Sequence, residues 1–558
     1  MRYSVMGVAI LLFIVGLFTL NWWLIVLAGL AVVVGIYDMV QTKHSVLTNY
    51  PISGHIRYLL ENFRPEIRQY LLEDEKQQVP FSRQQRALVY QRAKDVSDTN
   101  AFGTLDNLYS EGKEWFLQSA MSQPIKDSNF RIMIGGDRCQ QPYSLSVFNI
   151  SAMSFGSLSG NAIMALNQGA KIGGFTHDTG EGAISPYHRK FGGDLIWELG
   201  TGYFGCRDDA GNFDPQLFAE RASDPQVKMI EIKLSQGAKP GKGGVLPAEK
   251  ITPEIADTRR IPMGVDCISP ATHTAFATPK GMVEFWQQLR ALSGGKPVGF
   301  KLCIGQPWQF MAIVKAMIEM DDYPDFIVVD GAEGGTGAAP VEFMDSVGMP
   351  LTDGFLLVHN TLVGAGIRDK IKVGVSGKIV SGFDIARMLA LGADWCNSAR
   401  GFMFAVGCIQ SRSCHTNTCP TGVATQDPYR QQALDVPSKA ERVANFHKNT
   451  LKSLANIVGA VGLAHPTDLK PYHIARRMDD GQIKLLSKYY YFTDEGALLD
   501  GSARADVFNQ MWVMANPNSF AADNDALIAY NQDSRDKGKN TKTVANPTPQ
   551  GAIATESE

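Results

Sequence analysis

The chain has 558 residues, and its 53 lysines and arginines against 56 aspartates and glutamates give a formal net charge of −3. The charges are mixed along the chain, so no basic stripe indicates a nucleic-acid-binding protein. Eight cysteines in a chain of this length do not make a secreted, disulfide-stapled protein. The length fits two or more domains, although a barrel of about 250 residues with insertions counts as one domain.

The first 40 residues are almost entirely apolar. No charged residue occurs from Tyr3 to Tyr37, and the polar stretch TLN at 19–21 interrupts the run. One membrane-spanning helix needs ~20 residues, so the run is too long for a single span. Residues 1–40 therefore predict a transmembrane helical hairpin, with helices at about 4–20 and 22–39.

Charged residues flank this run on both sides. Arg2 precedes it, and Lys43, His44 and Arg57 follow it. Under the positive-inside bias, we expect a two-pass anchor in the inner or cell membrane, with both ends and the catalytic domain in the cytoplasm. A cleaved signal peptide is the alternative, but the run lacks a small-x-small cleavage site before a polar start.

Residues 41–130 are mixed and charged. Helical patterns occur in ISGHIRYLLENF and FSRQQRALVYQRAK, and Arg64-Pro65 and Val79-Pro80 punctuate them. Proline disfavours a helix through the residue that precedes it. We expect a helical linker or collar that packs on the next domain, with a spacer that has no chemistry as the alternative.

From about residue 130, short apolar strands end in glycine-rich loops and alternate with helical stretches. Alternation of this kind predicts a parallel sheet with covering helices. More than five such units in one block favour an α/β fold with a closed (β/α)8 TIM barrel over residues 131–465, rather than an open Rossmann sheet. In such a barrel the active site is built from the loops at the C-terminal ends of the strands. The strand-then-loop units are SLSVFNISAMSFG, KMIEIKLSQG, PVGFKLCIG, DFIVVDGAEGG, IKVGVSGKI and ADWCNSARG.

Three cysteines, Cys408, Cys414 and Cys419, lie close together in GCIQSRSCHTNTCPTGVATQ. Three thiolates on one loop can hold an iron–sulfur cluster. Structural zinc prefers four ligands in C-x2-4-C pairs, whereas the spacing here is C-x5-C-x4-C and His415 is badly placed to share the metal of Cys414. We expect an iron–sulfur cluster on the loop 408–419, with zinc or inert buried cysteines as alternatives.

Residues 466–558 extend beyond the barrel. The last 45 residues or so turn polar, in NQDSRDKGKNTKTVANPTPQGAIATESE, and are expected to form a disordered tail. No second cysteine cluster and no Rossmann G-x-G-x-x-G unit occurs in the sequence. Direct binding of NAD(P)H is therefore not expected, and electrons should arrive from a ferredoxin-like donor or a membrane redox protein.

The segment CHTNTCPTGVATQDP resembles the cluster loop of the FMN-binding domain of glutamate synthases. Other segments resemble the same family in the same order, over about residues 130–460: SAMSFGSLS at 151–159, DTGEGAISP at 178–186, EIKLSQGAKPGKGG at 231–244 and DGAEGGTGAAP at 330–340. The chain is thereby identified as a membrane-anchored, stand-alone member of the family. The resemblance implies bound FMN and a [3Fe–4S] cluster held by Cys408, Cys414 and Cys419.

Barrel geometry indicates where the FMN phosphate would bind. Barrel phosphate sites use the loops after strands seven and eight, where glycine lets the backbone approach the anion. The candidate loops are SGKIVSGFDIARML, with Ser376 and Gly377, and NSARGFM, with Arg400 and Gly401. Tight strand-to-helix turns that need glycine are the alternative for either loop alone.

Five further residues are assigned to the flavin. By the resemblance, Ser151 and Met153 would lie at the isoalloxazine edge, and Gly331 and Gly335 belong to the site through the glycine-rich run DGAEGGTGAAP. Lys301 ends a strand in GFKLCIG and could place its ammonium near the flavin pyrimidine, where negative charge grows on reduction. A solvated surface lysine is the alternative for Lys301.

The expected catalytic residues are Lys233, Lys239 and Glu181. The two lysines bracket the SQGA turn in KLSQGAK, a natural cradle for a dicarboxylate. The matching positions of the family hold 2-oxoglutarate and 2-iminoglutarate, and the glutamate that matches Glu181 faces the same ligand. The resemblance implies that ammonia condenses with 2-oxoglutarate and that reduced FMN reduces the imine to glutamate, the cluster reloading the flavin. A loop brace is the alternative role for Glu181.

Two departures from the family limit what can be carried over. Val245 stands in KGGVLPAEK where the family has a glutamine that helps to bind the keto acid, so one hydrogen bond to the substrate is lost. The chain has no cysteine before Cys139, whereas large glutamate synthase subunits begin with an amidotransferase domain that has an N-terminal cysteine. Free ammonium, another amine or a separate amidotransferase subunit would then supply nitrogen.

Two other functions stay open at this point. One is an FMN and iron–sulfur oxidoreductase that acts on a different substrate and is coupled to a membrane or ferredoxin-type electron donor. The other is a non-catalytic electron-transfer subunit, against which the intact Lys233, Lys239 and Glu181 count.

Overall fold

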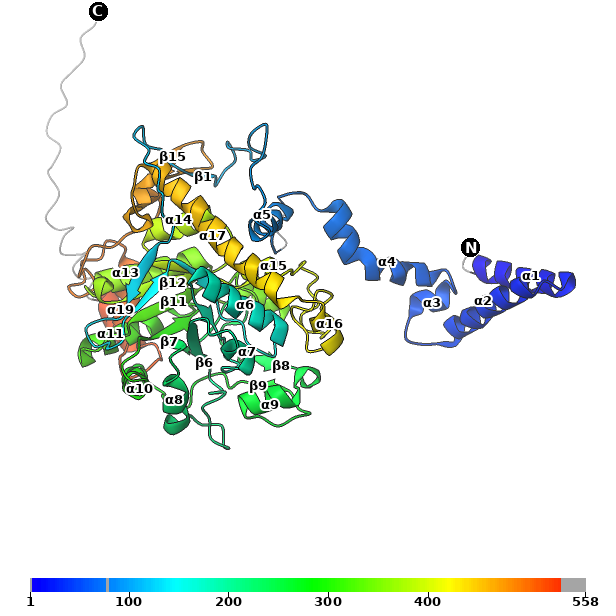
Figure 1. The fold of residues 1–558 in the computed structure, drawn as a ribbon, viewed down its shortest axis with the longest axis horizontal. Helices are drawn as coiled ribbons and strands as arrows, with labels where there is room; N and C mark the ends of the chain where they lie inside the picture. The colour runs from blue at the N-terminus through cyan, green and yellow to red at the C-terminus, as the bar shows by residue number, and fades with distance from the viewer. Residues whose placement is uncertain (1–2, 77–79, 533–558) are drawn as a thin grey trace, which may run out of the picture. The chain divides into compact units, whose positions relative to one another are not determined.

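The computed structural model describes residues 3–76 and 80–532. The chain divides into two compact units, Met1–Gln84 and Gln85–Glu558 (Figure 1). The expected disordered tail lies, from residue 533 onward, outside the described residues.

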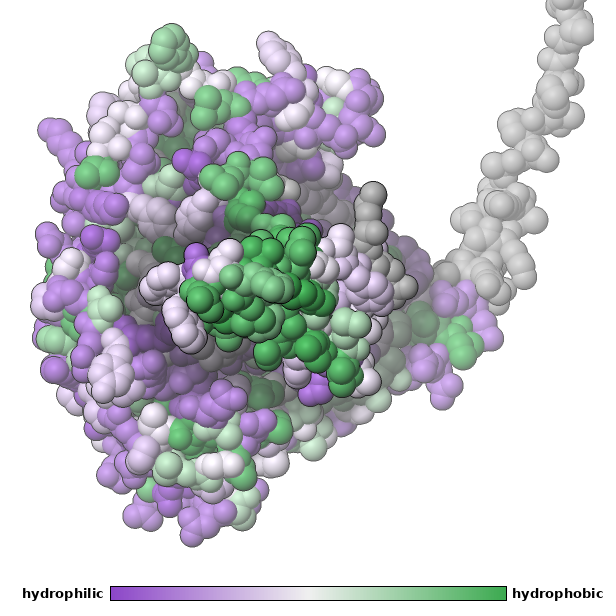
Figure 2. Space-filling model, turned by 90° about the vertical axis from the view of Figure 1, so that its right-hand side faces the viewer, coloured by the Kyte–Doolittle hydropathy of each residue, from purple (hydrophilic) through white to green (hydrophobic). Residues whose placement is uncertain are grey.

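Two apolar helices begin the first unit, α1 (Ser4–Thr19) and α2 (Trp22–Val40), and they pack against each other. A Cβ at Gly16 of α1 would lie 3.1 Å from Ile25 of α2, so glycine allows this close approach. Among the described residues only α2 is long and apolar enough to cross a membrane, whereas α1 is a shorter apolar helix. Large apolar side chains of both helices are exposed, and Figure 2 shows this hydrophobic surface in green.

Short helices complete the first unit: α3 (Ser45–Asn49), α4 (Gly54–Ile67) and the π-helical turn η1 (Arg68–Leu72). The buried Asp38 of α2 joins them to the apolar pair, since its carboxylate accepts from Ile52 N at 2.9 Å and lies 2.9 Å from His55 Nε2. Pro65 lies inside α4 rather than at its end. Proline lacks the N–H that donates within a helix, and the π-helical turn η1 follows, where Arg68 N donates to the carbonyls of Arg64 and Pro65.

The second unit contains a closed barrel of eight parallel strands, which confirms the predicted (β/α)8 fold. Most strand residues are buried, as in parallel strands covered by helices, and some of the buried side chains are polar or charged. Counting from β4, their order around the barrel follows the order in the chain. The strands are β4 (Phe148–Ile150), β5 (His177–Asp178), β6 (Leu195–Leu199), β7 (Val227–Lys233), β10 (Val298–Leu302), β11 (Phe326–Asp330), β12 (Lys372–Ser376) and β13 (Trp395–Ser398).

Helices surround the barrel (Figure 1), and several begin at a side-chain cap of the kind that satisfies the first free N–H groups. Ser159, Thr278 and Ser381 accept such bonds at the starts of α6, α10 and α14. The long helix α17 packs against α6 and α14. The helices are α6 (Gly160–Gly173), α7 (Pro186–Arg189), α8 (Pro215–Ala222), α10 (Pro279–Leu292), α11 (Pro307–Met320), α12 (Val341–Ser346), α13 (Leu351–Gly364), α14 (Gly382–Leu391), α15 (Arg400–Ala405), α16 (Pro428–Gln432) and α17 (Val436–Val461), with the 3-10 turn η3 (Arg368–Lys370).

A β-hairpin of β2 (Arg131–Ile134) and β3 (Tyr143–Ser146) closes the N-terminal end of the barrel. Its Ile134 and Leu145 pack into one core cluster with barrel residues near the starts of the strands, Ile196, Met229, Phe326, Val328 and Trp395. The C-terminal ends of the strands are thereby left as the open mouth.

An insertion between β7 and α10 and the C-terminal segment complete the second unit. The insertion contains β8 (Val245–Leu246), the 3-10 turn η2 (Ala248–Lys250), α9 (Pro253–Arg259) and β9 (Cys267–Ile268). Helix α5 (Arg83–Ala93) leads into this unit, and β1 (Glu114–Phe116) pairs with β14 (Ile474–Arg477), which pairs with β15 (Ile483–Leu485). The remaining elements are η4 (Pro466–Asp468), η5 (Pro471–His473), α18 (Leu486–Tyr489) and α19 (Asp506–Met514).

Candidate active site

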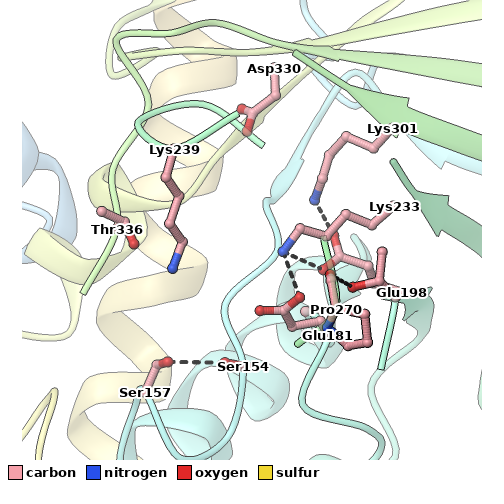
Figure 3. Close-up of polar contacts among 12 residues, drawn as sticks. Ser154, Ser157, Glu181, Glu198, Lys233, Lys239, Pro270, Lys301, Asp330 and Thr336 are labelled. Atoms are coloured by element: carbon pink, nitrogen blue, oxygen red, sulfur yellow. Dashed lines mark hydrogen bonds and ion pairs between the residues drawn. The ribbon is translucent and has the colours of Figure 1, made fainter. Parts of the chain in front are cut away.

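Lys233, the last residue of β7, lies beside Glu181 of the loop after β5. Lys233 Nζ is 2.9 Å from Glu181 Oε2 and 3.9 Å from Glu198 Oε1 (Figure 3). Burial raises the pKa of Glu181, but Lys233 and neighbouring cations outweigh burial and leave this pKa below its ordinary value. Glu181 is therefore a carboxylate at neutral pH, and it orients the Lys233 ammonium at the barrel mouth.

Glycines make room for the Glu181 side chain. A Cβ at Gly244 would lie 1.9 Å from Glu181 Oε1, and one at Gly200 would lie 2.8 Å from Glu181 Cβ. A side chain at either position would displace the carboxylate. In the GKGG run that precedes β8, close approach to Glu181 thus explains Gly244, whereas Gly241 has a positive φ and open space around it.

Lys239 belongs to the loop after β7 and is buried. Its Nζ donates to Ala338 O at 3.4 Å, and no carboxylate of the described residues lies within ion-pairing distance of it. Burial lowers the pKa of Lys239, and Glu181 partly offsets this effect. Figure 3 shows Lys239 approaching the mouth from a different side than Lys233. A small hollow beside Lys233 is lined by Glu181, Thr201, Gln236, Lys242, Gly244 and Pro270.

Lys301 of β10 is buried inside the barrel and not at the protein surface. Its Nζ contacts Glu198 Oε2 and lies 3.2 Å from Glu231 Oε1. Burial alone would lower the pKa of Lys301, but Glu198 and Glu231 outweigh burial and raise it. The alternative of a solvated surface lysine is therefore wrong.

The carboxylates around Lys301 were not identified from the sequence. Ligand oxygens of Asp178, Glu198 and Glu231 lie within 4.8 Å of one another. Burial raises the pKa of Asp178 to about 7, although Lys301 opposes this shift, and burial likewise raises the pKa of Glu231. The available signal was a single acid in each of two strands, LIWEL, which is otherwise apolar, and KMIEIK, which has a lysine at each end.

The loops assigned to the FMN phosphate follow the seventh and eighth barrel strands, β12 and β13. Ser376 ends β12, and its hydroxyl lies 3.2 Å from that of Ser151, which follows β4. Gly331 N donates to Ser376 O at 2.8 Å. A Cβ at Gly377 would meet Leu351 at 3.1 Å. These loops therefore come together at one side of the mouth.

Arg400 begins α15 and lies against the glycine-rich loop after β11. A Cβ at Gly335 would lie 2.8 Å from Arg400 Cδ, and Arg400 Nη2 donates to Glu333 O at 2.6 Å. Burial lowers the pKa of Arg400 to about 10, so it remains a cation at neutral pH. Gly401 follows it, where a Cβ would lie 2.5 Å from Ser398 Oγ.

Met153 lies in the loop after β4 and is buried. A Cβ at Gly180, in the loop that carries Glu181, would lie 2.9 Å from the carbonyl carbon of Met153. Met153, expected at the flavin edge, and Glu181, expected to face the substrate, therefore belong to adjoining loops.

Cys408, Cys414 and Cys419 follow α15 in a segment without regular secondary structure. Burial raises the pKa of Cys408 to about 12, and the neighbouring Cys414 and Cys419 thiolates contribute. Burial also raises the pKa of Cys419, but N–H groups of 421, 423 and 424 and the Thr421 hydroxyl outweigh it and lower this pKa. The structure thus gathers the three thiols and provides hydrogen bonds that stabilise thiolate at one of them.

The three thiols are not spaced as ligands of a single ion. Among the described residues, the group with ligand atoms within 4.8 Å of one another is the Asp178 acid group and not the cysteines. Sulfur ligands of one zinc ion, at ~2.3 Å from the metal, lie closer together than that. The spacing therefore counts against a preformed zinc site.

Lys250 and Gln426 join the cysteine segment to the loop after β4, and the sequence did not indicate either residue. Lys250 Nζ donates to Ser157 O at 3.0 Å and to Cys414 O at 3.4 Å. Gln426 Nε2 donates to Gly156 O at 3.0 Å and to Leu158 O at 2.8 Å. No local pattern predicts these contacts, because those of Lys250 depend on how the insertion after β7 folds back and those of Gln426 on how the cysteine segment packs against the loop after β4.

Val245 lies in β8 and pairs with Ile268 of the antiparallel strand β9. Their neighbours Leu246 and Cys267 are buried, whereas Ile268 is 68% exposed. Side chains alternate between the two faces of a strand, so Val245 shares the open face with Ile268. One member of this apolar pair, Val245, follows directly after Gly244, the glycine that approaches Glu181.

Comparison with known sequences identifies relatives that are named as glutamate synthases or as similar to them. The family described as "Conserved region in glutamate synthase" matches residues 90–464. The chain is 36% identical over 490 residues to the glutamate synthase large subunit-like protein YerD of Bacillus subtilis, covering 80% of this chain and 93% of that protein. It is 34% identical over 340 residues to the archaeal-type glutamate synthase [NADPH] of Thermotoga neapolitana, covering 60% of this chain and 64% of that one.

Solved structures that match the fold of this chain include a mandelate oxidase with a monooxide FMN adduct. It has a TM-score of 0.37 and 16% identity, with 72% of this chain and 91% of that one covered. A flavocytochrome b2 with bound pyruvate has a TM-score of 0.41 and 12% identity, with 80% of this chain and 90% of that one covered.

Proposed function

The chain belongs to the glutamate synthase family of oxidoreductases, and from this premise we propose that it is a membrane-anchored FMN and iron–sulfur enzyme that forms glutamate. Its proposed reaction is the reduction of the 2-imino acid that 2-oxoglutarate and ammonia form. One observation carries the proposal: the ionised Glu181 and the lysines Lys233 and Lys239 share one barrel mouth with the loops after the seventh and eighth strands.

The residues at those two loops and at the loop after β11 fit FMN. Gly335 and Gly401 stand where a Cβ would collide with a neighbour, and Arg400 provides a cation beside them. The Ser151 and Ser376 hydroxyls supply donors between the first and seventh strands. Bound FMN would supply hydride chemistry at the mouth. Lys301, held by Glu198 and Glu231, would supply a buried cation at this site.

The cysteine segment fits a [3Fe–4S] cluster held by Cys408, Cys414 and Cys419. The thiols lie near one another, and the N–H groups around Cys419 supply the hydrogen bonds to sulfur that tune such clusters. A bound cluster would pass electrons one at a time toward the flavin. The contacts of Gln426 with the loop after β4 support a short route between the two cofactors.

The substrate would be held by the two lysines. Lys239, which has no carboxylate partner among the described residues, and Lys233 would each bind one carboxylate of 2-oxoglutarate through charge-assisted hydrogen bonds. The ionised Glu181 would orient Lys233 and accept a proton from the nitrogen as it bonds to the keto carbon.

The surroundings of the enzyme are part of the proposal. Helices α1 and α2 would anchor it in the inner or cell membrane by two passes, with the barrel in the cytoplasm, and their exposed apolar surface supports this. A ferredoxin-type or membrane redox protein would deliver electrons. Free ammonium or a separate amidotransferase subunit would supply nitrogen.

A second candidate is the same redox enzyme acting on a different substrate. Val245 favours it, because it pairs with Ile268 on an apolar face where the family offers a glutamine donor. A non-catalytic electron carrier is not favoured, since a carrier needs neither Lys239 nor the Lys233–Glu181 pair.

A substrate screen with reduced protein tests the assignment. The protein is purified anaerobically, its flavin and iron are measured, and the reduced flavin is mixed with keto acids and amines one pair at a time. Reoxidation by 2-oxoglutarate with ammonium supports the proposal. Reoxidation only by another pair selects the second candidate, and a protein without flavin refutes both.

A further inference from the structure

Lys250 is a buried cation beside the cysteine segment. It ends the turn η2 in the insertion after β7, and its side chain is 3% exposed. Its Nζ donates to Ser157 O at 3.0 Å and to Cys414 O at 3.4 Å. The lysine therefore joins the loop after β4 to the segment that carries the cysteines.

No carboxylate compensates this ammonium. Among the described residues no Asp or Glu oxygen lies within ion-pairing distance of Lys250 Nζ, and the acidic groups that act on it are the thiols of Cys414 and Cys419. Burying a charge without a partner is costly. The position is therefore suited to a negative group bound by those two sulfurs.

The surrounding contacts hold Lys250 in place. Ser159 Oγ donates to Gly422 O at 2.7 Å, and Ser159 N donates to Val423 O at 2.9 Å. With Gln426, these bonds fix the 156–159 segment against the cysteine segment on both sides of Lys250. The ammonium thus has a fixed position relative to the sulfurs, and little reorganisation would accompany a change of charge there.

We propose that Lys250 is the counter-charge of the iron–sulfur cluster and sets its reduction potential. The inference rests on the proposed function, since it requires the cluster. Reduction adds one negative charge, and a fixed cation at short range in a buried site stabilises the reduced form more than the oxidised form. The lysine therefore raises the potential, so that the cluster accepts an electron more readily before passing it to the flavin.

Lys296 provides a matched control. It too is buried, and its Nζ donates to two carbonyls, Ala222 O at 2.5 Å and Asp224 O at 2.8 Å. It precedes β10 and therefore lies at the N-terminal end of the barrel, away from the cysteines. Losing either lysine removes a buried brace, but only Lys250 lies beside the sulfurs.

The test is an EPR-monitored redox titration of the purified full-length protein at one fixed pH, with iron content measured alongside. Lys250→Met should make cluster reduction at least tenfold less favourable, a potential lower by about 59 mV or more for a one-electron couple. Lys250→Arg keeps the charge and should stay near the parent. Lys296→Met should leave the potential unchanged. An iron-replete Lys250→Met protein with the parent potential would overturn the proposal.

If Lys250→Met loses iron, the same redox titration is made on Lys250→Gln. This variant keeps a hydrogen-bond donor for the two carbonyls but has no charge. A lowered potential in that variant supports the counter-charge, and an unchanged potential overturns it. A third outcome is that both neutral variants lose iron while Lys250→Arg retains it at the parent potential. Cluster binding then requires a positive charge at this position, which supports the proposal. If Lys250→Arg also loses iron, the proposal is overturned, and Lys250 acts as a structural brace. Failure of the proposed function can be told apart from failure of the counter-charge proposal, because the parent protein itself would then contain zinc or no metal.

Discussion

Lys233 Nζ and Glu181 Oε2 lie 2.9 Å apart, although one residue ends β7 and the other follows β5. The barrel brings the two strand ends together at its mouth, and Gly244 leaves the space that the carboxylate occupies. Glu181 stays ionised because the neighbouring lysines outweigh the cost of burying its carboxylate. A group proposed to orient the substrate thus also contributes to folding stability.

Glu181→Gln should therefore destabilise the protein in a pH-dependent way. The folded-state pKa of Glu181 is lowered, so its stabilisation is present above the unfolded value near 4.5 and is lost as pH falls through the folded value. At neutral pH the substitution should cost roughly 1.5–3 kcal/mol, as for a hydrogen bond to a charged group. Urea unfolding of parent and variant at neutral and acidic pH measures the difference, which should shrink in acid. A pH-independent difference would contradict the ion pair.

Asp178 should affect the pH dependence of folding stability in the direction opposite to Glu181, and Asp178→Asn should remove this effect. Burial raises the folded pKa of Asp178 to about 7 from 3.8, so between these values the folded state holds a proton that the unfolded state has lost. The parent should lose stability as pH rises through this window, by up to about 1.4 kcal/mol per pH unit for one proton. The variant should show a flatter profile, which chemical denaturation across the window measures. Because Asp178 titrates together with Glu231, Glu231→Gln serves as the companion variant, and parent-like slopes in both would refute the assignment.

The sequence was sufficient to predict the barrel and to place the candidate site residues at one end of it. Alternating strands and helices place Lys233, Ser376 and Arg400 at strand ends or in the loops that follow, and closure of the barrel then brings them to one mouth. No side-chain contact is needed for that prediction, because parallel strands all end on the same side.

The buried polar contacts could not be predicted in the same way. Glu198 and Glu231 belong to apolar strands, and their grouping around Lys301 depends on which faces turn inward when the barrel closes. Lys250 reaches Cys414 only because the insertion after β7 folds back over the mouth. Both arrangements depend on tertiary packing between distant segments, which local patterns do not encode.

Cys414→Ser should abolish the EPR signal of the oxidised cluster and lower the iron content while the fold is kept. The serine hydroxyl is a poor substitute for a thiolate ligand, and the cysteine lies in an irregular segment outside the barrel strands. Cys139→Ser is the control, since that thiol contacts Gly295 O near the hairpin that closes the other end of the barrel. Stoichiometric zinc without iron in the parent would refute the cluster.

Removal of the N-terminal unit should release a soluble flavoprotein from membranes. Deleting residues 1–40 removes the apolar helices but also Asp38, which leaves Ile52 and His55 without their carboxylate partner. A deletion of residues 1–84 removes the whole compact unit and is the cleaner variant. Fractionation with flavin absorbance measures the outcome. Full-length protein found in the soluble fraction with an intact N-terminus would contradict the membrane anchor.

Substrate identity is tested by Lys239→Ala and Val245→Gln together. If 2-oxoglutarate with ammonium reoxidises the reduced flavin, Lys239→Ala should weaken keto acid binding by about tenfold or more, because a carboxylate loses a charge-assisted contact. Lys280→Ala, which removes a surface ion pair with Glu319, should leave binding unchanged.

Val245→Gln should leave the affinity unchanged or improve it, because a donor is restored on the open face of β8 beside Ile268. Stopped-flow reoxidation over a range of keto acid concentrations separates affinity from rate. If 2-oxoglutarate fails to reoxidise the flavin in both the parent and Val245→Gln, the glutamate-forming assignment falls. The same barrel mouth would then act on a substrate that makes use of the apolar pair, and keto acids with apolar side chains become the first to screen.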